Sequence, residues 1–355
     1  MKNLVLLLCF LLLFPLLGSC GITAPDRQVF AISMAIDLAE NGGFVLTIQS
    51  PQGMPAGGEP AAASGGARGY AVYSAASGDL PHALHLLEAS LPFPLNFSQL
   101  RLCFLSTGVL AEKNLESLAL ELLRFPSMRA QAVLLAVQGS AREALQAQRT
   151  TFSMRLSTHM DTMLQNLVAK GYLPQSSLGS VLQDLGSGRR DPLLGLGAVN
   201  GLLASQGEGS GGGEASQGAF SQSRPVLEDA DTAGSTLLMG DNPVEMMGAA
   251  VTALGRVVGM LSPRECVIFH HLKTNGRFLC AIQEENLQLQ IRLSQEDLND
   301  TILREGRALL EKLQALGSDP FGFANVSAHS FWTNEEWEAY GFRERYPSAD
   351  VYIGT

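Results

Sequence analysis

Short apolar runs alternate with segments of helical periodicity along most of the chain. Apolar runs bounded by turn residues predict strands, which in the first half fall at 29–36, 44–49, 69–74, 100–105 and 132–137. Apolar residues at helical spacing predict helices at 80–91, 110–123, 152–173 and 177–185, and a further helix over 141–148. Strands that alternate with helices after an opening hairpin indicate a mixed α/β domain.

The second half has a different order of elements. We expect a strand at 246–254, a hairpin from 278–282 and 287–293, and a closing strand at 351–353. Ser262 and Glu265 form a capping box that opens a helix, and a similar start at Ser294 opens a long helix that ends before Gly317. The chain is therefore predicted to be α+β, with an N-terminal mixed α/β domain, a Gly-rich linker, and a C-terminal α+β domain containing an antiparallel sheet and a long helix.

The N-terminus has the pattern of an export signal. Lys2 precedes an apolar run over 4–17, which is too short to span a membrane and typical of a signal peptide. The run ends in Leu-Gly-Ser-Cys, which resembles the lipobox of bacterial lipoproteins. This motif predicts cleavage between Ser19 and Cys20 and lipid attachment to the Cys20 thiol. The alternative is an ordinary secretory signal in which the cysteine stands by chance.

Domain boundaries follow from the signal and from one low-complexity stretch. The sequence GEGSGGGEASQ at 207–217 has no residues able to form a core, so it is predicted to be a flexible linker. We expect a signal peptide at 1–19, an N-terminal domain at 20–204, a linker at 205–223 and a C-terminal domain at 224–355.

Composition and charge exclude some functions. Hydrophobic residues make up 46% of the chain and charged residues 16%, which indicates a globular protein. With 24 Lys and Arg against 34 Asp and Glu, the net charge is −10, so no nucleic-acid partner is expected. Removal of the signal peptide takes away Lys2 and leaves 336 residues with a net charge of −11.

Candidate sites for chemistry are few, and we predict no catalytic residue, metal site or cofactor. Cys266 and His270 are only half of a zinc site, and a disulfide between Cys266 and Cys280 is the alternative use of these cysteines. Cys103 lies in an apolar run and is expected to be a buried thiol. The glycines at 195–201 lack the spacing of a dinucleotide loop and are interpreted as a flexible connection.

One aromatic group allows two interpretations. Trp332, Trp337 and Tyr340 lie close together in the sequence, either in the core or on a surface that faces a partner. Core packing is the preferred interpretation.

Several short motifs follow in order behind the lipobox. They are Ala-Ile-Asp at 35–37, the strand ending in Gln-Ser-Pro at 46–51, Leu-Pro-Phe-Pro at 91–94, the step into a helix at 255–265, QALGSDPFGF at 314–323, and the block from Phe331-Trp332 to Tyr346-Pro347. Together they resemble the Ger(x)C family of spore germination lipoproteins. The stretch 276–293 is short for this family, and the segments at 51–68 and 207–217 are richer in Gly and Ala.

The resemblance implies a non-catalytic C subunit of a nutrient germinant receptor. Such a subunit is lipid-anchored on the outer face of the spore's inner membrane and assembles with membrane-embedded A and B subunits. One alternative is a solute-binding lipoprotein of a transporter, which would have two similar lobes, whereas the halves of this chain differ. Another is a lipid-anchored hydrolase, for which the sequence has no nucleophile motif such as G-x-S-x-G.

Overall fold

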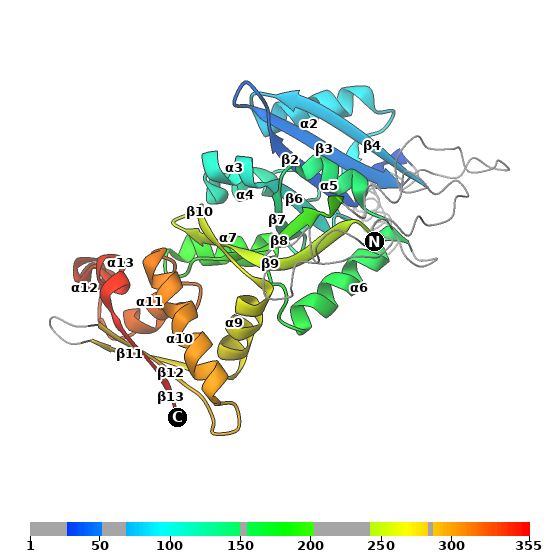
Figure 1. Ribbon diagram of the computed structural model, residues 1–355. Coiled ribbons are helices and arrows are strands. Elements are labelled where there is room, and N and C mark those ends of the chain that lie inside the picture. Colours follow the sequence, from blue (N-terminus) through cyan, green and yellow to red (C-terminus); the bar gives the residue numbers. More distant parts are fainter. Residues whose placement is uncertain (1–26, 52–68, 150–154, 202–241, 283–286) are drawn as a thin grey trace, which may run out of the picture.

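The computed structural model describes residues 27–51, 69–149, 155–201, 242–282 and 287–355. The predicted signal peptide, Ser19, Cys20 and the linker at 205–223 lie outside these ranges. Within them the chain is mixed α and β, as the sequence predicts, with a large sheet and a smaller one at opposite ends of the molecule (Figure 1).

The larger sheet has eight strands in the order β10-β9-β8-β7-β6-β2-β3-β4. Its central strands β2, β6, β7 and β8 are parallel, and antiparallel strands extend it on both sides. The strands are β2 (Ser33–Leu38), β3 (Phe44–Pro51), β4 (Tyr70–Ser77), β6 (Leu102–Ser106), β7 (Val133–Gln138), β8 (Leu193–Val199), β9 (Val244–Ala253) and β10 (Arg256–Leu261).

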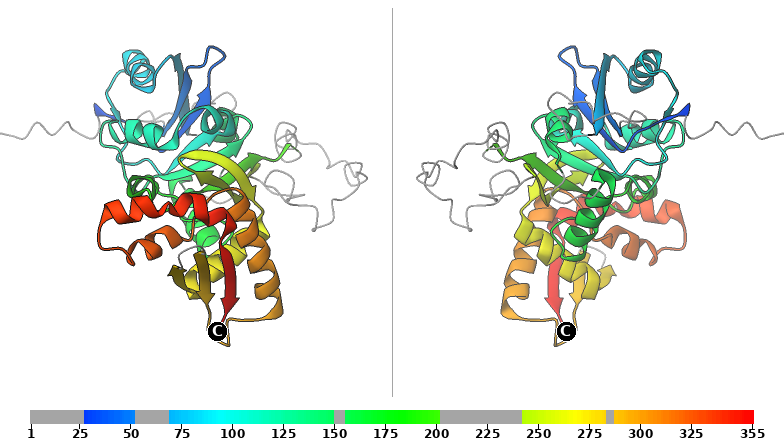
Figure 2. Two further views of the ribbon diagram at one scale, coloured as in Figure 1. Left: turned by 90° about the vertical axis from the view of Figure 1, so that its left-hand side faces the viewer. Right: turned by 90° about the vertical axis from the view of Figure 1, so that its right-hand side faces the viewer.

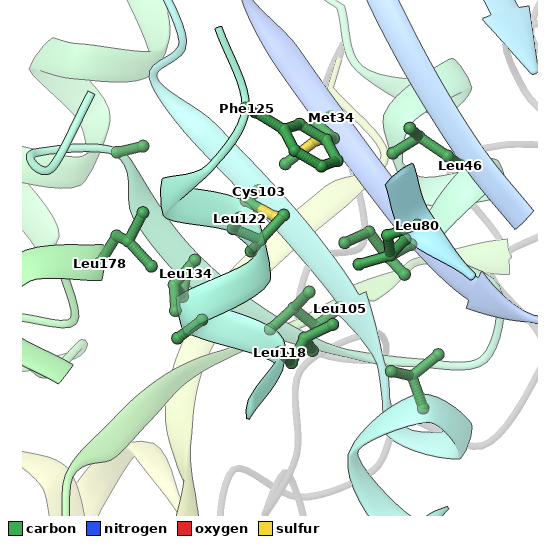
Figure 3. Packing of buried hydrophobic residues seen from close by; sticks show 14 of the residues in the cluster. Met34, Leu46, Leu80, Cys103, Leu105, Leu118, Leu122, Phe125, Leu134 and Leu178 are labelled. Carbon is green, nitrogen blue, oxygen red and sulfur yellow. The ribbon is translucent and has the colours of Figure 1, made fainter. Parts of the chain in front are cut away.

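Helices cover both faces of this sheet. One face packs against α2 (Leu80–Ser90), α3 (Thr107–Glu112), α4 (Leu115–Leu123) and α7 (Leu178–Ser187). The other packs against α5 (Ala141–Ala147) and α6 (Leu156–Ala169). Because side chains alternate between two buried faces, the central strands read as unbroken apolar runs. Figure 3 shows the first core, in which Cys103 is buried among leucines as expected.

The segment 193–199 corrects the expectation of a flexible connection at 195–201. It forms β8, a buried strand between β7 and β9. Leu135 on β7 occupies the space beside both glycines: a Cβ would lie 2.9 Å from its Cδ1 at Gly195 and 2.7 Å from its Cδ2 at Gly197. These glycines therefore allow close packing of a neighbouring side chain, and they do not make the backbone flexible.

The smaller sheet contains β11 (Arg277–Ile282), β12 (Leu287–Arg292) and β13 (Asp350–Gly354). The hairpin of β11 and β12 is antiparallel as predicted, but β13 is parallel to β12, so the sheet is mixed. The helices of this part of the chain are α9 (Pro263–Asn275), α10 (Asp300–Ala315), α11 (Phe323–Ala328), α12 (Asn334–Tyr340) and α13 (Phe342–Arg345), followed by the 3-10 turn η4 (Tyr346–Ser348).

Two helix starts can be compared with the sequence. The capping box of Ser262 and Glu265 is present at the start of α9. The long helix α10 starts at Asp300, and its N-cap is Asn299, whose side chain accepts a hydrogen bond from Ile302 N. Ser294, the expected start, instead bonds Asp297 in a preceding turn.

The strand pairing also corrects the expected C-terminal domain at 224–355. Strand β9 pairs antiparallel with β8, and β10 pairs with β9. Residues 244–261 therefore complete the larger sheet, which contains strands from both sides of the predicted linker. A second hydrophobic core packs Leu193, Ala249, Val251 and Leu261 of this larger sheet against α9, and it extends through α10 to the smaller sheet.

Candidate functional site

The predicted lipid-attachment residue, Cys20, and the cleavage position at Ser19 lie outside the described residues. The first strand of the described residues is β1 (Val29–Phe30), which pairs in parallel with β5 (Leu95–Asn96). Hydrogen bonds from Val29 N to Pro94 O and from Ala31 N to Asn96 O, both 3.0 Å, fix this point next to β2.

A buried carboxylate joins the larger sheet to the helices of the second core. The Asp191 side chain is 1% exposed and lies between the end of α7 and the start of β8. It accepts hydrogen bonds from Leu254 N at 3.1 Å, from Asp319 N at 2.9 Å and from both Nη atoms of Arg343. Arg343 also donates to Gly188 O at 3.2 Å. One aspartate thus holds three segments that are far apart in the sequence.

A second buried carboxylate, Asp319, opens α11. Its oxygens accept hydrogen bonds from Gly322 N at 2.9 Å, Phe323 N at 3.0 Å and Ala324 N at 2.7 Å. Burial raises the pKa of the Asp319 carboxyl to about 6, while the three N–H donors act in the opposite direction. Together Asp191 and Asp319 organise the junction between the two cores.

A cavity of about 230 Å³ lies beside this junction, between α7, the start of β8 and α9. Its polar lining includes Asp184 and Lys273. Burial, together with the nearby Arg190 charge, lowers the pKa of the Lys273 ammonium to about 8. Asp184 forms an ion pair with Arg190 at 3.6 Å, and Lys273 Nζ lies 5.2 Å from the centroid of the Phe269 ring. These lining residues do not include a nucleophile hydrogen-bonded to a base.

The histidines and cysteines considered for a metal site or a disulfide form neither within the described ranges. His271 bonds Asp297 O at 2.9 Å, and both His270 and His271 are partly exposed. Cys266 and Cys280 are free thiols, so the alternative of a disulfide is wrong. Burial raises the pKa of both to about 12. Within the described ranges, no three His, Cys, Asp or Glu side chains are grouped closely enough to hold a metal ion.

The two tryptophans of the aromatic group differ: Trp337 is packed, whereas Trp332 is exposed. Trp337 packs against Phe331, Tyr340 and Phe342, with ring centroids 5.4–6.5 Å apart. Trp332 is 97% exposed. The sequence pattern identified the aromatic residues but could not separate the packed indole from the exposed one.

Comparison with known proteins identifies the family. Residues 24–198 match the family model described as the spore germination protein N-terminal domain. The chain belongs to the Ger(x)C family of spore germination proteins. Membership in this family gives the chain a role in spore germination. The match ends at Ala198 within β8, so β9, β10 and the smaller sheet lie beyond it.

The structure of this Ger(x)C-family protein was also compared with solved structures. It is similar to the crystal structure of the GerBC protein with a TM-score of 0.46 and 11% sequence identity, over 90% of this chain and 94% of that chain. No curated protein matches the sequence. In the described part of the chain, no helix is both long and apolar enough to cross a membrane.

Proposed function

We propose that this chain is a non-catalytic, lipid-anchored subunit of a nutrient germinant receptor. The observation that carries the proposal is the family match, which begins at residue 24, directly behind the lipobox cysteine Cys20. The described polar groups support a non-catalytic role, because the buried carboxylates bind backbone N–H groups and one arginine and thereby hold segments of the fold together.

The proposed anchor is compatible with the way the chain enters the fold. Eight residues lie between Cys20 and Val29, the first residue of β1, and the nine extended steps from Cys20 to Val29 reach about 30 Å. A diacylated cysteine gives stable membrane attachment because two acyl chains act together. The folded part would then stay close to the membrane and meet its partners at high effective concentration.

We propose the outer face of the spore's inner membrane as the location and the membrane-embedded A and B subunits of the receptor as the partners. The net charge of −10 supports attachment through acyl chains, since a chain with this charge has little electrostatic attraction to anionic lipids. It equally disfavours a nucleic-acid partner.

The anchor can be tested with two cysteine substitutions in sporulating cells. Cys20→Ala should move the protein from the membrane fraction to the soluble fraction and reduce nutrient germination. Cys9→Ala is the matched control, because Cys9 lies within the predicted signal peptide and should leave both readouts unchanged. Full membrane retention of Cys20→Ala would contradict the anchor.

The receptor role needs a separate test. The tagged chain, extracted from spore membranes in mild detergent, should co-purify with A-type and B-type membrane subunits. Deletion of the gene in a strain without redundant receptors should abolish the response to nutrients but preserve the response to non-nutrient triggers. An intact nutrient response in that strain would refute the proposal.

A further inference from the structure

The smaller sheet has one face that no described helix covers. Side chains alternate along its strands, and the buried set, including Leu289, Ile291 and Ile353, packs against α9 and α10. The opposite set forms what we call the outer face: Arg277, Leu279, Ala281, Gln288, Gln290, Arg292, Asp350, Tyr352 and Gly354. Leu279 is 39% exposed and Tyr352 is 54% exposed, so apolar and aromatic surface faces solvent here.

Two arginines lie directly opposite each other on this face. Arg277 and Arg292 are register partners on β11 and β12, and both are exposed. No ion pair of the described residues involves either of them, and Arg292 Nη2 lies 3.4 Å from Gln290 Oε1. Like charges in directly opposed positions destabilise a sheet. In a chain with a net charge of −10, such a pair is a local concentration of positive charge that an anionic group would neutralise.

Tyr352 extends this arrangement toward the third strand. A Cβ at Gly354 would lie 2.5 Å from the Tyr352 hydroxyl oxygen, so the phenol folds over Gly354. Gly354 is the register partner of Arg292. The outer face therefore presents two guanidinium groups and a phenol hydroxyl in one row across three strands, with Leu279 and Gln290 in the next row.

We infer that the outer face is a docking surface for an acidic, extended segment of a partner protein. Guanidinium groups pair with carboxylates in a bidentate geometry, and Arg and Tyr are the residues that contribute most at protein interfaces. Rows on one face of a sheet repeat about every 7 Å, which is also the spacing of alternate side chains in an extended peptide. A partner segment can thus place carboxylates on the arginine row and an apolar residue on Leu279.

A membrane surface fits the outer face less well. Two arginines in a chain of net charge −10 give weak attraction to anionic lipids. The smaller sheet also lies at the opposite end of the molecule from β2, β3 and β4 (Figures 1 and 2), and the proposed anchor enters the fold next to β2. The distance of the smaller sheet from the anchor depends on the proposed function, whereas the net charge and the strand register do not.

The surface can be tested by photo-crosslinking in intact spores. The full chain carries p-benzoylphenylalanine in place of Leu279 or, as a control, of Leu123 on α4, which has a similar exposure of 42%. Crosslinked peptides are mapped by mass spectrometry. We expect protein crosslinks from position 279 to a segment rich in Asp and Glu, with a yield clearly above that at position 123.

Arginine variants then test the charge. Arg277→Gln with Arg292→Gln should lower the crosslink yield at 279 at least tenfold, since the loss of one charge-assisted bond worth about 1.5 kcal/mol already corresponds to a factor of about ten. Arg124→Gln with Arg307→Gln removes the same charge from exposed sites elsewhere and should have no effect. Tyr352→Phe, which keeps the ring, should give a smaller decrease than the arginine pair.

Four results would overturn the inference. They are crosslinks to phospholipid alone, crosslinks to protein segments without carboxylates, a yield at 279 no greater than at 123, or an unchanged yield in the double arginine variant. The membrane fraction is assayed in the same spores, so failure of the proposed anchor is seen separately, as loss of the unsubstituted chain from the membrane.

Discussion

The Asp191 carboxylate offers the sharpest test of how the two cores are joined. Asp191→Ala would leave the buried N–H of Asp319 without its acceptor and would remove the charged partner of Arg343. An unsatisfied buried donor costs about 1–3 kcal/mol, and a hydrogen bond to a charged group is worth about 1.5–3 kcal/mol. The N–H of Leu254 adds little, because Leu254 is 73% exposed and water can replace the carboxylate.

The expected loss in free energy of unfolding is therefore about 3–5 kcal/mol, the range for breaking a buried ion pair. Removal of the negative charge beside Asp319 offsets a part of it. Equilibrium urea unfolding, followed by far-UV circular dichroism at constant pH, measures the difference.

Asp161→Ala provides the matched control, because Asp161 pairs with Arg101 at 3.0 Å but is 34% exposed. That surface pair should contribute less than about 1 kcal/mol. A double-mutant cycle of Asp191→Asn and Arg343→Gln should show a coupling of about 1–3 kcal/mol. If Asp191→Ala costs no more than Asp161→Ala, the junction is not held by this carboxylate and the reasoning is wrong.

Three further predictions concern single groups. Gly197→Ala should lower the free energy of unfolding by about 1–3 kcal/mol, because the new Cβ meets Leu135 Cδ2 at 2.7 Å, whereas Gly186→Ala, with open space around it, should not; equal effects in urea unfolding would refute the packing argument. Burial raises the pKa of Asp319 from 3.8 to about 6, so the folded state binds more protons than the unfolded state between these values. The free energy of unfolding should then fall by up to about 3 kcal/mol as pH rises from 4 to 6, and Asp319→Asn should remove this slope; the same slope in the variant would refute the assignment. Burial raises the pKa of the Cys266 and Cys280 thiols to about 12, so both should react slowly with a thiol reagent at pH 8. The reaction is measured on a chain that lacks the signal peptide and carries Cys20→Ala. Cys280, the half-buried thiol of the two, should react first, and rapid reaction of Cys266 would contradict the structure.

The sequence predicted local structure well wherever a segment carried its own signal. Buried strands with unbroken apolar runs, such as 102–106 and 133–137, lie where expected. The capping box at Ser262 also formed, because its two hydrogen bonds depend only on residues within one helical turn. These elements need no information from distant parts of the chain.

Strand β8 shows what local signals omit. Gly195 and Gly197 lower the intrinsic preference for a strand, so the pattern around them indicates a loop. Their role depends on Leu135, a residue about 60 positions earlier, whose side chain fills the space that two Cβ atoms would occupy. A contact of this kind is visible only once β7 and β8 are known to be neighbours.

The proposed functional features also differ in whether they depend on distant parts of the chain. The predicted lipobox is a contiguous motif, so its prediction needs only four residues. The outer face depends on register: Arg277 and Arg292 are 15 positions apart in the sequence and become neighbours through the hairpin, and Tyr352 joins them through β13. The hairpin itself was predicted, but the parallel addition of β13 was not, because β13 reaches β12 only after α10 to α13.

The predicted domain boundary does not separate two sheets, and the entropy of loop closure explains why. A Gly-rich stretch indicates a flexible connection, but it does not indicate that the segments it connects fold apart. The cost of closing a flexible loop grows only with the logarithm of its length, so doubling the loop costs about 0.6 kcal/mol. Pairing β9 with β8 buries strand residues such as Ala249, Ala250 and Val251, which are 0% exposed. At about 25 cal/mol per Å² of apolar surface, burial on this scale outweighs the entropy of a longer loop, so strands from beyond the predicted linker can complete the larger sheet.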